Sequence, residues 1–171
     1  MPPRPKKDNS APLGATTLSK FNVTLARLGD LGILVSHRQK MWGDIHPELG
    51  AAVEGSKKIT RAWIRRGLSE KSLIGFIARA PGGAVAGSGC IWVREEQPRP
   101  TSPGLLVPYL MSMYTERPYR HKGVARLVVK SAMKWCKDRK YDRIILHASA
   151  EGKPLYIGLG FEPTNEMRLK L

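Results

Sequence analysis

Hydrophobic residues recur along the chain with two spacings, which predict strands and helices in alternation. A period of two marks a strand, and a spacing of three to four marks an amphipathic helix. The longest helical pattern covers residues 122–140, where Val124, Leu127, Val128 and Trp135 share one face. The predicted strands cover residues 21–25, 72–80, 84–95, 105–115 and 143–148, with one or two more from residue 161, and the predicted helices cover residues 30–42, 51–66, 122–140 and 153–159.

The order of these elements is β-α-α-β-β-β-α-β-α-β, which predicts a mixed sheet with helices on both faces. Pro81-Gly82-Gly83 predicts a tight turn, so the strands on either side of it pair as an antiparallel hairpin. The strand–helix–strand segment 105–148 implies a right-handed crossover between parallel strands. The predicted fold class is therefore α/β (α+β with a mixed sheet), with a central parallel unit of fourth strand, third helix and fifth strand.

Length and composition predict one domain behind a short tail. Residues 1–19 are basic, rich in proline and without apolar periodicity, which predicts a flexible tail, and residues 20–171 form the domain. The longest uncharged run, residues 100–115, is too short and too interrupted by proline to span a membrane. Cys90 and Cys136 are too few for a disulfide framework or a four-thiolate zinc site. We therefore expect a cytoplasmic protein without a metal or a membrane partner.

The charge balance is strongly basic. Lysine and arginine number 29 against 14 aspartates and glutamates, a net charge of +15. Such a field attracts polyanions, so nucleic acid stays open as a partner, although no nucleic-acid motif supports it. The helix 122–140 also carries a basic stripe, for which a solvated outer face is the ordinary explanation. Its members are Arg126, Lys130, Lys134 and Lys137.

The junction between the strand 105–115 and the helix 122–140 carries the candidate chemistry. A helix N-terminus presents unpaired backbone N–H groups and the positive end of the helix dipole. Gly123 and Ala125 are small enough to let a phosphate approach this backbone, while Arg117, Arg120 and Lys122 add positive charge. The junction therefore predicts an anion site suited to a pyrophosphate. A solvated helix start is the alternative.

Two segments of the chain resemble the motifs of a known enzyme family. The run Arg120-x-x-Gly123-x-Ala125 resembles the R/Q-x-x-G-x-G/A motif of the GCN5-related N-acetyltransferase (GNAT) family. Residues 155–161, which read LYIGLGF, resemble its L-Y-x-x-L-G-F segment. The resemblance covers residues 20–171. It implies a GNAT-like fold and direct transfer of an acetyl group from acetyl-CoA to an amine acceptor in a ternary complex.

The resemblance also implies a role for each matching residue. The backbone N–H groups of residues 122–125, with Arg120, would hold the pyrophosphate of coenzyme A. The backbone of Met113 and Thr115 would pair with the pantetheine arm, and the Met113 N–H would face the developing oxyanion. Tyr156 would lie near the sulfur as a catalytic residue. The implied cofactor-binding residues are Met113, Thr115, Arg120, His121, Lys122, Gly123, Val124, Ala125 and Ser149, of which Ser149 stands where many members carry asparagine.

The residue that accepts the proton of the acceptor amine stays open. A lysine-like amine of pKa about 10.4 costs ~4.6 kcal/mol to neutralise at pH 7, whereas an α-amine near 7.8 costs about 1 kcal/mol. The need for a strong base therefore depends on the acceptor. A chain of water molecules is one alternative. The candidate side chains are Asp44, His46, Glu48, Glu95 and His147.

The resemblance implies a small-molecule or peptide amine as the acceptor, and the sequence leaves its identity open. The net charge argues weakly against a polycation such as a polyamine. Two other functions remain as alternatives: a basic nucleic-acid- or ribosome-associated protein with this fold, which would bind RNA or DNA with a steep salt dependence, and a non-catalytic acyl-CoA sensor. A homodimer also stays open.

Overall fold

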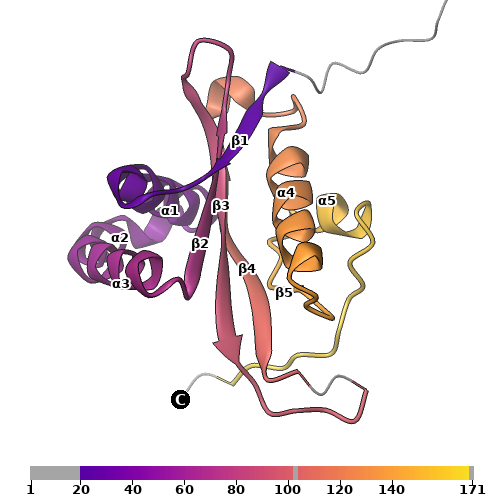
Figure 1. Ribbon diagram of the computed structural model, residues 1–171. Coiled ribbons are helices and arrows are strands. Elements are labelled where there is room, and N and C mark those ends of the chain that lie inside the picture. The colour runs from indigo at the N-terminus through magenta and orange to yellow at the C-terminus, as the bar shows by residue number, and fades with distance from the viewer. Residues whose placement is uncertain (1–19, 102–103, 170–171) are drawn as a thin grey trace, which may run out of the picture.

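The computed structural model describes residues 20–101 and 104–169, so the predicted tail 1–19 lies outside the described residues. These residues form one five-stranded sheet with helices on both faces (Figure 1). The strands are β1 (Asn22–Leu25), β2 (Leu73–Arg79), β3 (Val85–Glu95), β4 (Leu106–Thr115) and β5 (Ile145–Leu146). The α-helices are α1 (Leu31–Ile45), α2 (Gly50–Gly55), α3 (Lys57–Glu70), α4 (Val124–Asp138) and α5 (Lys153–Ile157).

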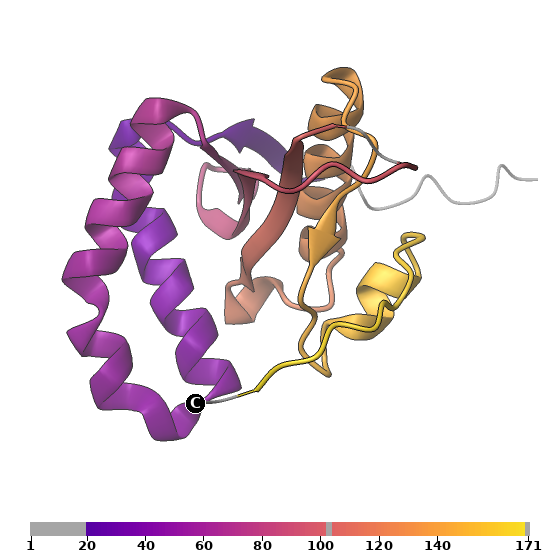
Figure 2. The ribbon, with the colours of Figure 1, turned by 90° about the horizontal axis from the view of Figure 1, so that it is seen from below.

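The sheet topology confirms the predicted mixed sheet and its parallel unit. The strand order is β1-β2-β3-β4-β5, in which the first three pairings are antiparallel and β4 pairs with β5 in parallel. The helix α4 connects these two parallel strands, as the crossover rule requires. Helices α1 and α3 lie side by side on one face of the sheet, and α4 lies on the other (Figures 1 and 2).

The period of two along the strands divides the core into two clusters, one on each face. Phe76 packs with α4, whereas its neighbour Ile77 packs with α1 and α3. The helix α4 buries Val124, Val128 and Val129 against the sheet, at exposures of 1% or less. This continuous apolar face fixes the position of the helix N-terminus.

Several elements differ from the predictions, and α1 and α3 extend beyond their predicted ends at residues 42 and 66. The predicted helix 51–66 is two helices, because the Ser56 hydroxyl donates to the Val53 carbonyl oxygen at 2.8 Å and competes with the helical pattern. The fifth strand is shorter than predicted. The predicted strand from residue 161 is wrong, because residues 161–169 contain no strand, and the polar sequence around Pro163 offers no apolar face to bury.

No helix within the described parts of the chain is both long and apolar enough to cross a membrane.

Gly87 of β3 tests the packing of α4 against the sheet. A Cβ at this position would lie 2.8 Å from the Tyr114 carbonyl oxygen and 2.9 Å from Val124 Cγ1. Because both neighbours belong to packed backbone or core, we expect Gly87→Ala to lower the free energy of unfolding by about 1–3 kcal/mol. Urea denaturation measures this change.

Gly32→Ala in α1 is the matched control. Its Cβ would meet nothing within 4 Å, so the higher helix propensity of alanine should stabilise the protein by up to ~1 kcal/mol. An unchanged unfolding midpoint in Gly87→Ala would contradict the packing described here.

Candidate active site

The strand β4 contains a β-bulge near its carboxyl end. Ser88 of β3 lies opposite Tyr114, and Cys90 lies opposite Met111, so β4 has one more residue than β3 between these two pairs. The register therefore slips by one residue, and the strand bends there. Ser112, within the bulge, has a φ of 54°, a left-handed conformation that few side chains adopt without tertiary support.

The residue after the bulge, Met113, has no Cα partner in the β3–β4 register. Its side chain occupies space that Gly89 leaves open, since a Cβ on Gly89 would lie 2.2 Å from Met113 Sδ and 3.1 Å from Val128 Cγ1. Met113 is thus anchored toward α4, on the opposite face of the sheet from Ser112. The anchor fixes the backbone of Met113, which is the predicted oxyanion donor.

The strands β4 and β5 separate before they reach the bulge. They pair only at Tyr109 with Ile145 and at Leu110 with Leu146. Residues 111–115 of β4, which include Met113 and Thr115, therefore have no β5 partner on that side. An open strand edge of this kind can accept an extended ligand that carries amide groups, as in strand addition.

The N-terminus of α4 lies next to this open edge. Gly123 caps the helix with a φ of 80°, a conformation that favours glycine, and no side chain of the described residues caps the first turn. The N–H groups of Val124 and Ala125 therefore begin the helix without a side-chain acceptor, as an anion site requires. Lys122 makes no ion pair within the described residues, so its charge is available there.

Two of the basic residues predicted around this site are occupied by Asp44 of α1. Arg117 contacts Asp44 at 3.2 Å, and Arg120 contacts its other carboxylate oxygen. Arg120 Nε also donates to the Thr115 carbonyl oxygen at 3.1 Å. The hydrogen bond from Arg120 lowers the pKa of Asp44, which makes this carboxylate a poor base. Arg120 thus connects the loop before α4 to β4 and α1, and its guanidinium is already paired with Asp44.

The remaining candidate bases lie at different places. His46 and Glu48 contact each other at 3.1 Å at the exposed end of α1. Glu95 lies at the far end of the β3–β4 ladder from the bulge. His147, directly after β5, contacts the Tyr109 hydroxyl through Nδ1 at 2.5 Å and Glu166 through Nε2. Of the five candidates, His147 is the one whose side chain contacts the short segment of β4 that pairs with β5, at Tyr109.

Tyr156 lies on α5 with its ring largely buried against Phe161, at a centroid distance of 5.8 Å. Burial raises the pKa of Tyr156 to about 12, so the phenol stays protonated at physiological pH. Its ring and His147 both line a cavity of about 320 Å³ between β5, α5 and residues 161–166. The predicted cofactor residue Ser149 uses its hydroxyl within the chain, accepting from the Gly152 N–H at 3.1 Å before α5.

Two polar residues of α1, His37 and Arg38, make contacts that have no signal in the sequence. His37 is 3% exposed and bridges Ser88 Oγ at 2.8 Å and Glu116 Oε1 at 3.1 Å. Burial lowers the pKa of His37, which favours the neutral ring. Arg38 Nη1 donates to Ser112 Oγ at 3.0 Å, directly at the bulge.

The model of the acetyltransferase (GNAT) family matches residues 39–161, which is most of the chain. The chain belongs to the GNAT family. Its membership confirms the resemblance inferred from the α4 junction and the α5 segment. The fold is that of GNAT acetyltransferases, and the open β4 edge and the α4 N-terminus lie within the matched region.

Solved GNAT structures resemble the chain over almost its whole length. A GCN5-related N-acetyltransferase from Ralstonia eutropha JMP134 has 24% identity and a TM-score of 0.82, covering 88% of this chain and 98% of its own. A predicted acetyltransferase from Clostridium acetobutylicum, solved with acetyl-CoA, has 27% identity and a TM-score of 0.77 over 88% and 95%. An aminoglycoside N-acetyltransferase in complex with CoA has 18% identity and a TM-score of 0.66 over 88% and 93%. None of the curated proteins matches this GNAT sequence.

Gly123→Glu tests the anion site. Because φ is 80° at this position, glutamate strains the turn, and it also brings a negative charge to the first turn of α4. We expect acetyl-CoA to raise the melting temperature of the wild type by mass action and to leave that of the variant unchanged.

Gly82→Glu is the control for the strain, because Gly82 has a φ of 88° in the β2–β3 turn. It should keep the full stabilisation by acetyl-CoA. If acetyl-CoA raised the melting temperature of Gly123→Glu as much as that of the wild type, the α4 N-terminus would not be part of the binding site.

Proposed function

We propose that this GNAT protein is an acetyl-CoA-dependent N-acetyltransferase that transfers the acetyl group directly to an amine within a ternary complex. The observation that carries the proposal is the adjacency of two features: an open β4 edge after the bulge, and an uncapped, glycine-initiated N-terminus of α4. The first suits a pantetheine arm with its amide groups, and the second suits a pyrophosphate.

The residues at the site fit coenzyme A. Backbone N–H groups of residues 122–125 and the side chain of Lys122 would hold the pyrophosphate, and the backbone of Met113 and Thr115 would bind the pantetheine. Arg120 supports this loop through Thr115 and Asp44. Bound acetyl-CoA supplies the activated acetyl thioester.

The chain contributes two hydrogen-bond donors to the transfer. The Met113 N–H is held rigidly by the bulge and by the packing of its side chain, so it can face the carbonyl oxygen as that oxygen gains charge. Tyr156 is the second donor, toward the departing sulfur. Since its pKa is raised to about 12 and that of a thiol is about 8.5, full proton transfer would be uphill by ~4.8 kcal/mol. Tyr156 therefore donates a hydrogen bond and keeps its proton.

The geometry favours His147 as the group that accepts the proton of the amine. Glu166 contacts Nε2, which therefore carries the ring hydrogen, and Nδ1 accepts from the Tyr109 hydroxyl beside the cavity. The amine proton would pass to the Tyr109 oxygen while the Tyr109 proton moves to Nδ1 of His147. Asp44 is ion-paired, and Glu95 lies away from the bulge. A water chain ending at His147 would serve the same purpose for a remote amine.

The decisive experiment is a panel of amine acceptors with acetyl-CoA, followed by release of the free thiol and by mass spectrometry of the acetylated product. Turnover of any amine establishes the transferase. Stabilisation by acetyl-CoA without turnover of any amine would favour the acyl-CoA sensor. Binding of RNA or DNA with a steep salt dependence, without either result, would favour the nucleic-acid alternative.

Tyr156→Phe removes only the hydroxyl. We expect the turnover number to fall by roughly 10- to 1000-fold, or ~1.4–4 kcal/mol, because the lost hydrogen bond is strongest in the transition state. Calorimetry should find that the affinity for CoA changes by less than about threefold, because the ring and its packing on Phe161 remain.

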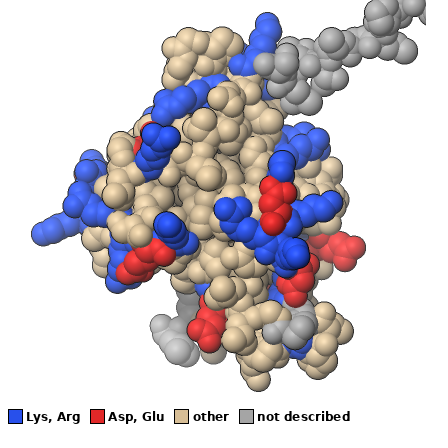
Figure 3. Space-filling view, in the orientation of Figure 1, with Lys and Arg blue, Asp and Glu red and all other residues tan. Residues whose placement is uncertain are grey.

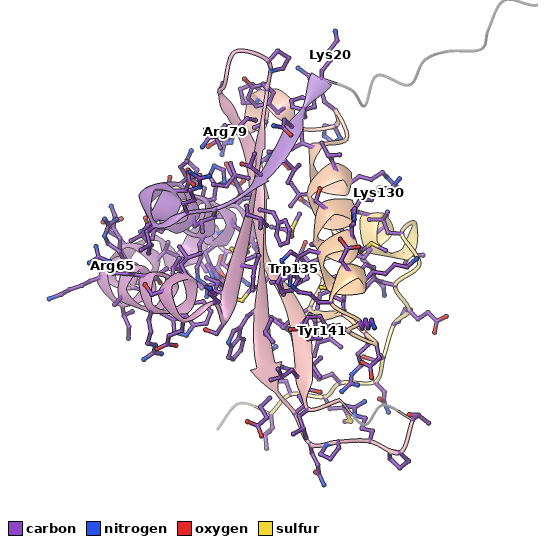
Figure 4. The ribbon with its side chains drawn as sticks, viewed as in Figure 1. Lys20, Arg65, Arg79, Lys130, Trp135 and Tyr141 are labelled. Atoms are coloured by element: carbon purple, nitrogen blue, oxygen red, sulfur yellow. The ribbon has the colours of Figure 1, made fainter. Side chains whose placement is uncertain are left out.

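Tyr141→Phe is the matched control, since Tyr141 stacks on Trp135 after α4, at a centroid distance of 5.9 Å, and the ring stack survives the change (Figure 4). Its kinetics should equal those of the wild type. A turnover number unaffected by Tyr156→Phe would assign Tyr156 to packing alone.

The two cysteines should not interfere with the thiol assay. Both are buried, and burial raises the pKa of Cys90 and of Cys136 to about 12. At pH 8 the thiolate fraction is then on the order of 10⁻⁴, so the folded protein should react only very slowly with a thiol reagent. Addition of denaturant should expose both thiols. Rapid reaction of the folded protein would contradict this burial.

A further inference from the structure

The side chain of Arg38 lies on the α1 face of the sheet, directly beside the β4 bulge. Its Nη1 atom donates to Ser112 Oγ at 3.0 Å, and the guanidinium lies over the Trp42 ring at 5.9 Å. Ser112 is the residue before Met113, the proposed oxyanion donor. Arg38 therefore places a fixed positive charge one residue from the proposed point of acetyl transfer, on the face opposite α4.

This charge has no counterion among the described residues. Among residues 20–101 and 104–169, no carboxylate lies within ion-pair distance of Arg38, and Ser112 is its one hydrogen-bond partner there. Four other partly buried arginines, Arg79, Arg94, Arg120 and Arg143, each contact a carboxylate. Arg126, on the other face of the sheet, donates to the Gly158 carbonyl oxygen at 3.3 Å. Desolvation lowers the pKa of Arg38. Burying part of a guanidinium with unused N–H donors costs free energy unless an anion accepts those hydrogen bonds.

The space beside Arg38 has the size and polarity for a small anionic ligand. A cavity of about 270 Å³ lies between α1, α2 and α3. Among the described residues that line it, Arg38 is the only charged one, and the hydroxyl of Thr60 and the ring of Trp42 form other walls. The nearby carboxylate Glu54 is already engaged by Gln39 at 3.3 Å and by Lys57 at 3.4 Å. The volume lies just below the range of typical drug-sized ligand sites, which suits a ligand of amino-acid size.

We propose that the acceptor is a small amine that carries a carboxylate, of the amino-acid class, and that Arg38 binds this carboxylate. The assignment rests on the proposed transferase function and names its substrate class. The guanidinium can donate two parallel N–H···O hydrogen bonds to a carboxylate, which fixes both the orientation and the position of the acceptor substrate. A polyamine or another polycationic acceptor lacks the group that Arg38 requires and is repelled by its charge.

The test compares amino acids with their own carboxamides. Each pair shares one amine and one side chain and differs in the negative charge. The amine of the carboxamide is the weaker base, so more of it is neutral, and any preference for the carboxylate must come from the carboxylate itself. For the wild type we expect kcat/KM to favour the amino acid by ~10- to 100-fold.

Arg38→Met should remove this preference. It should lower kcat/KM for the amino acid by ~10- to 100-fold more than it lowers kcat/KM for the carboxamide. Arg38→Lys should restore part of the preference, since lysine keeps the charge but loses the two-point contact. Arg65→Met is the matched control, because Arg65 is exposed on the outer side of α3 (Figure 4) and should change nothing.

Binding gives a second readout that does not depend on turnover. Calorimetry of the CoA complex should detect the amino acid with wild type and with Arg65→Met, and should not detect it with Arg38→Met. Stabilisation by acetyl-CoA should be equal in all three proteins, which verifies that the variants fold.

The outcomes separate this proposal from the one on which it rests. Equal or better turnover of carboxamides, polyamines or phosphorylated amines by the wild type would overturn the carboxylate assignment and leave the transferase intact. The absence of both turnover and binding for every amino acid would also overturn it. Failure of acetyl-CoA itself to stabilise the wild type would instead overturn the proposed function.

Discussion

The strand β4 pairs with its two neighbours over different lengths, and the candidate site depends on that difference. It follows β3 along its whole length, across the bulge at Ser112, but it leaves β5 after the pairs at Tyr109 and Leu110. The crossover then sends the chain from the end of β4 into α4 and back to β5. Because α4 buries a continuous apolar face on the sheet, its N-terminus must lie beside the edge that β5 leaves open. The topology alone therefore brings the open edge proposed to bind amide groups and the proposed anion site together.

Contacts between α1 and the segment after β4 hold the other face of this site. Asp44 binds Arg117 and Arg120, while Glu116 binds Lys40 at 2.6 Å and the buried ring of His37. Exposed ion pairs of this kind contribute little stability individually. Their effect here is geometric, because α1 carries the residues that would meet the acceptor and the loop 116–123 leads into the proposed pyrophosphate site. The helix α1 thus connects the proposed acceptor face to the proposed cofactor site.

The sequence predicted the elements whose side chains repeat with a clear period. The helix α4 and the strands β2 to β4 follow their apolar pattern because each has one continuous buried face, and Gly123 marks the start of α4 because its left-handed turn favours glycine. The motif at Gly123 also predicts an anion site at the α4 N-terminus, which stays a prediction. The break at Ser56 was missed because a single hydroxyl contact decides it. The short β5 and the missing last strand depend on whether a neighbouring strand stays close enough to pair, which no local pattern encodes.

The contacts of Arg38 and Arg120 could not be predicted because they join residues more than 70 positions apart. They also change the meaning of the net charge of +15. Figure 3 shows lysine and arginine spread over both flanks of the molecule, beside α3 and α4. Those charges are exposed and screened by salt, so they describe the surface more than the site. Around the proposed site, by contrast, Asp44 neutralises two arginines, whereas Arg38 has no carboxylate among the described residues. The position of one partly desolvated charge relative to the bulge therefore says more about the acceptor than the whole excess of basic residues.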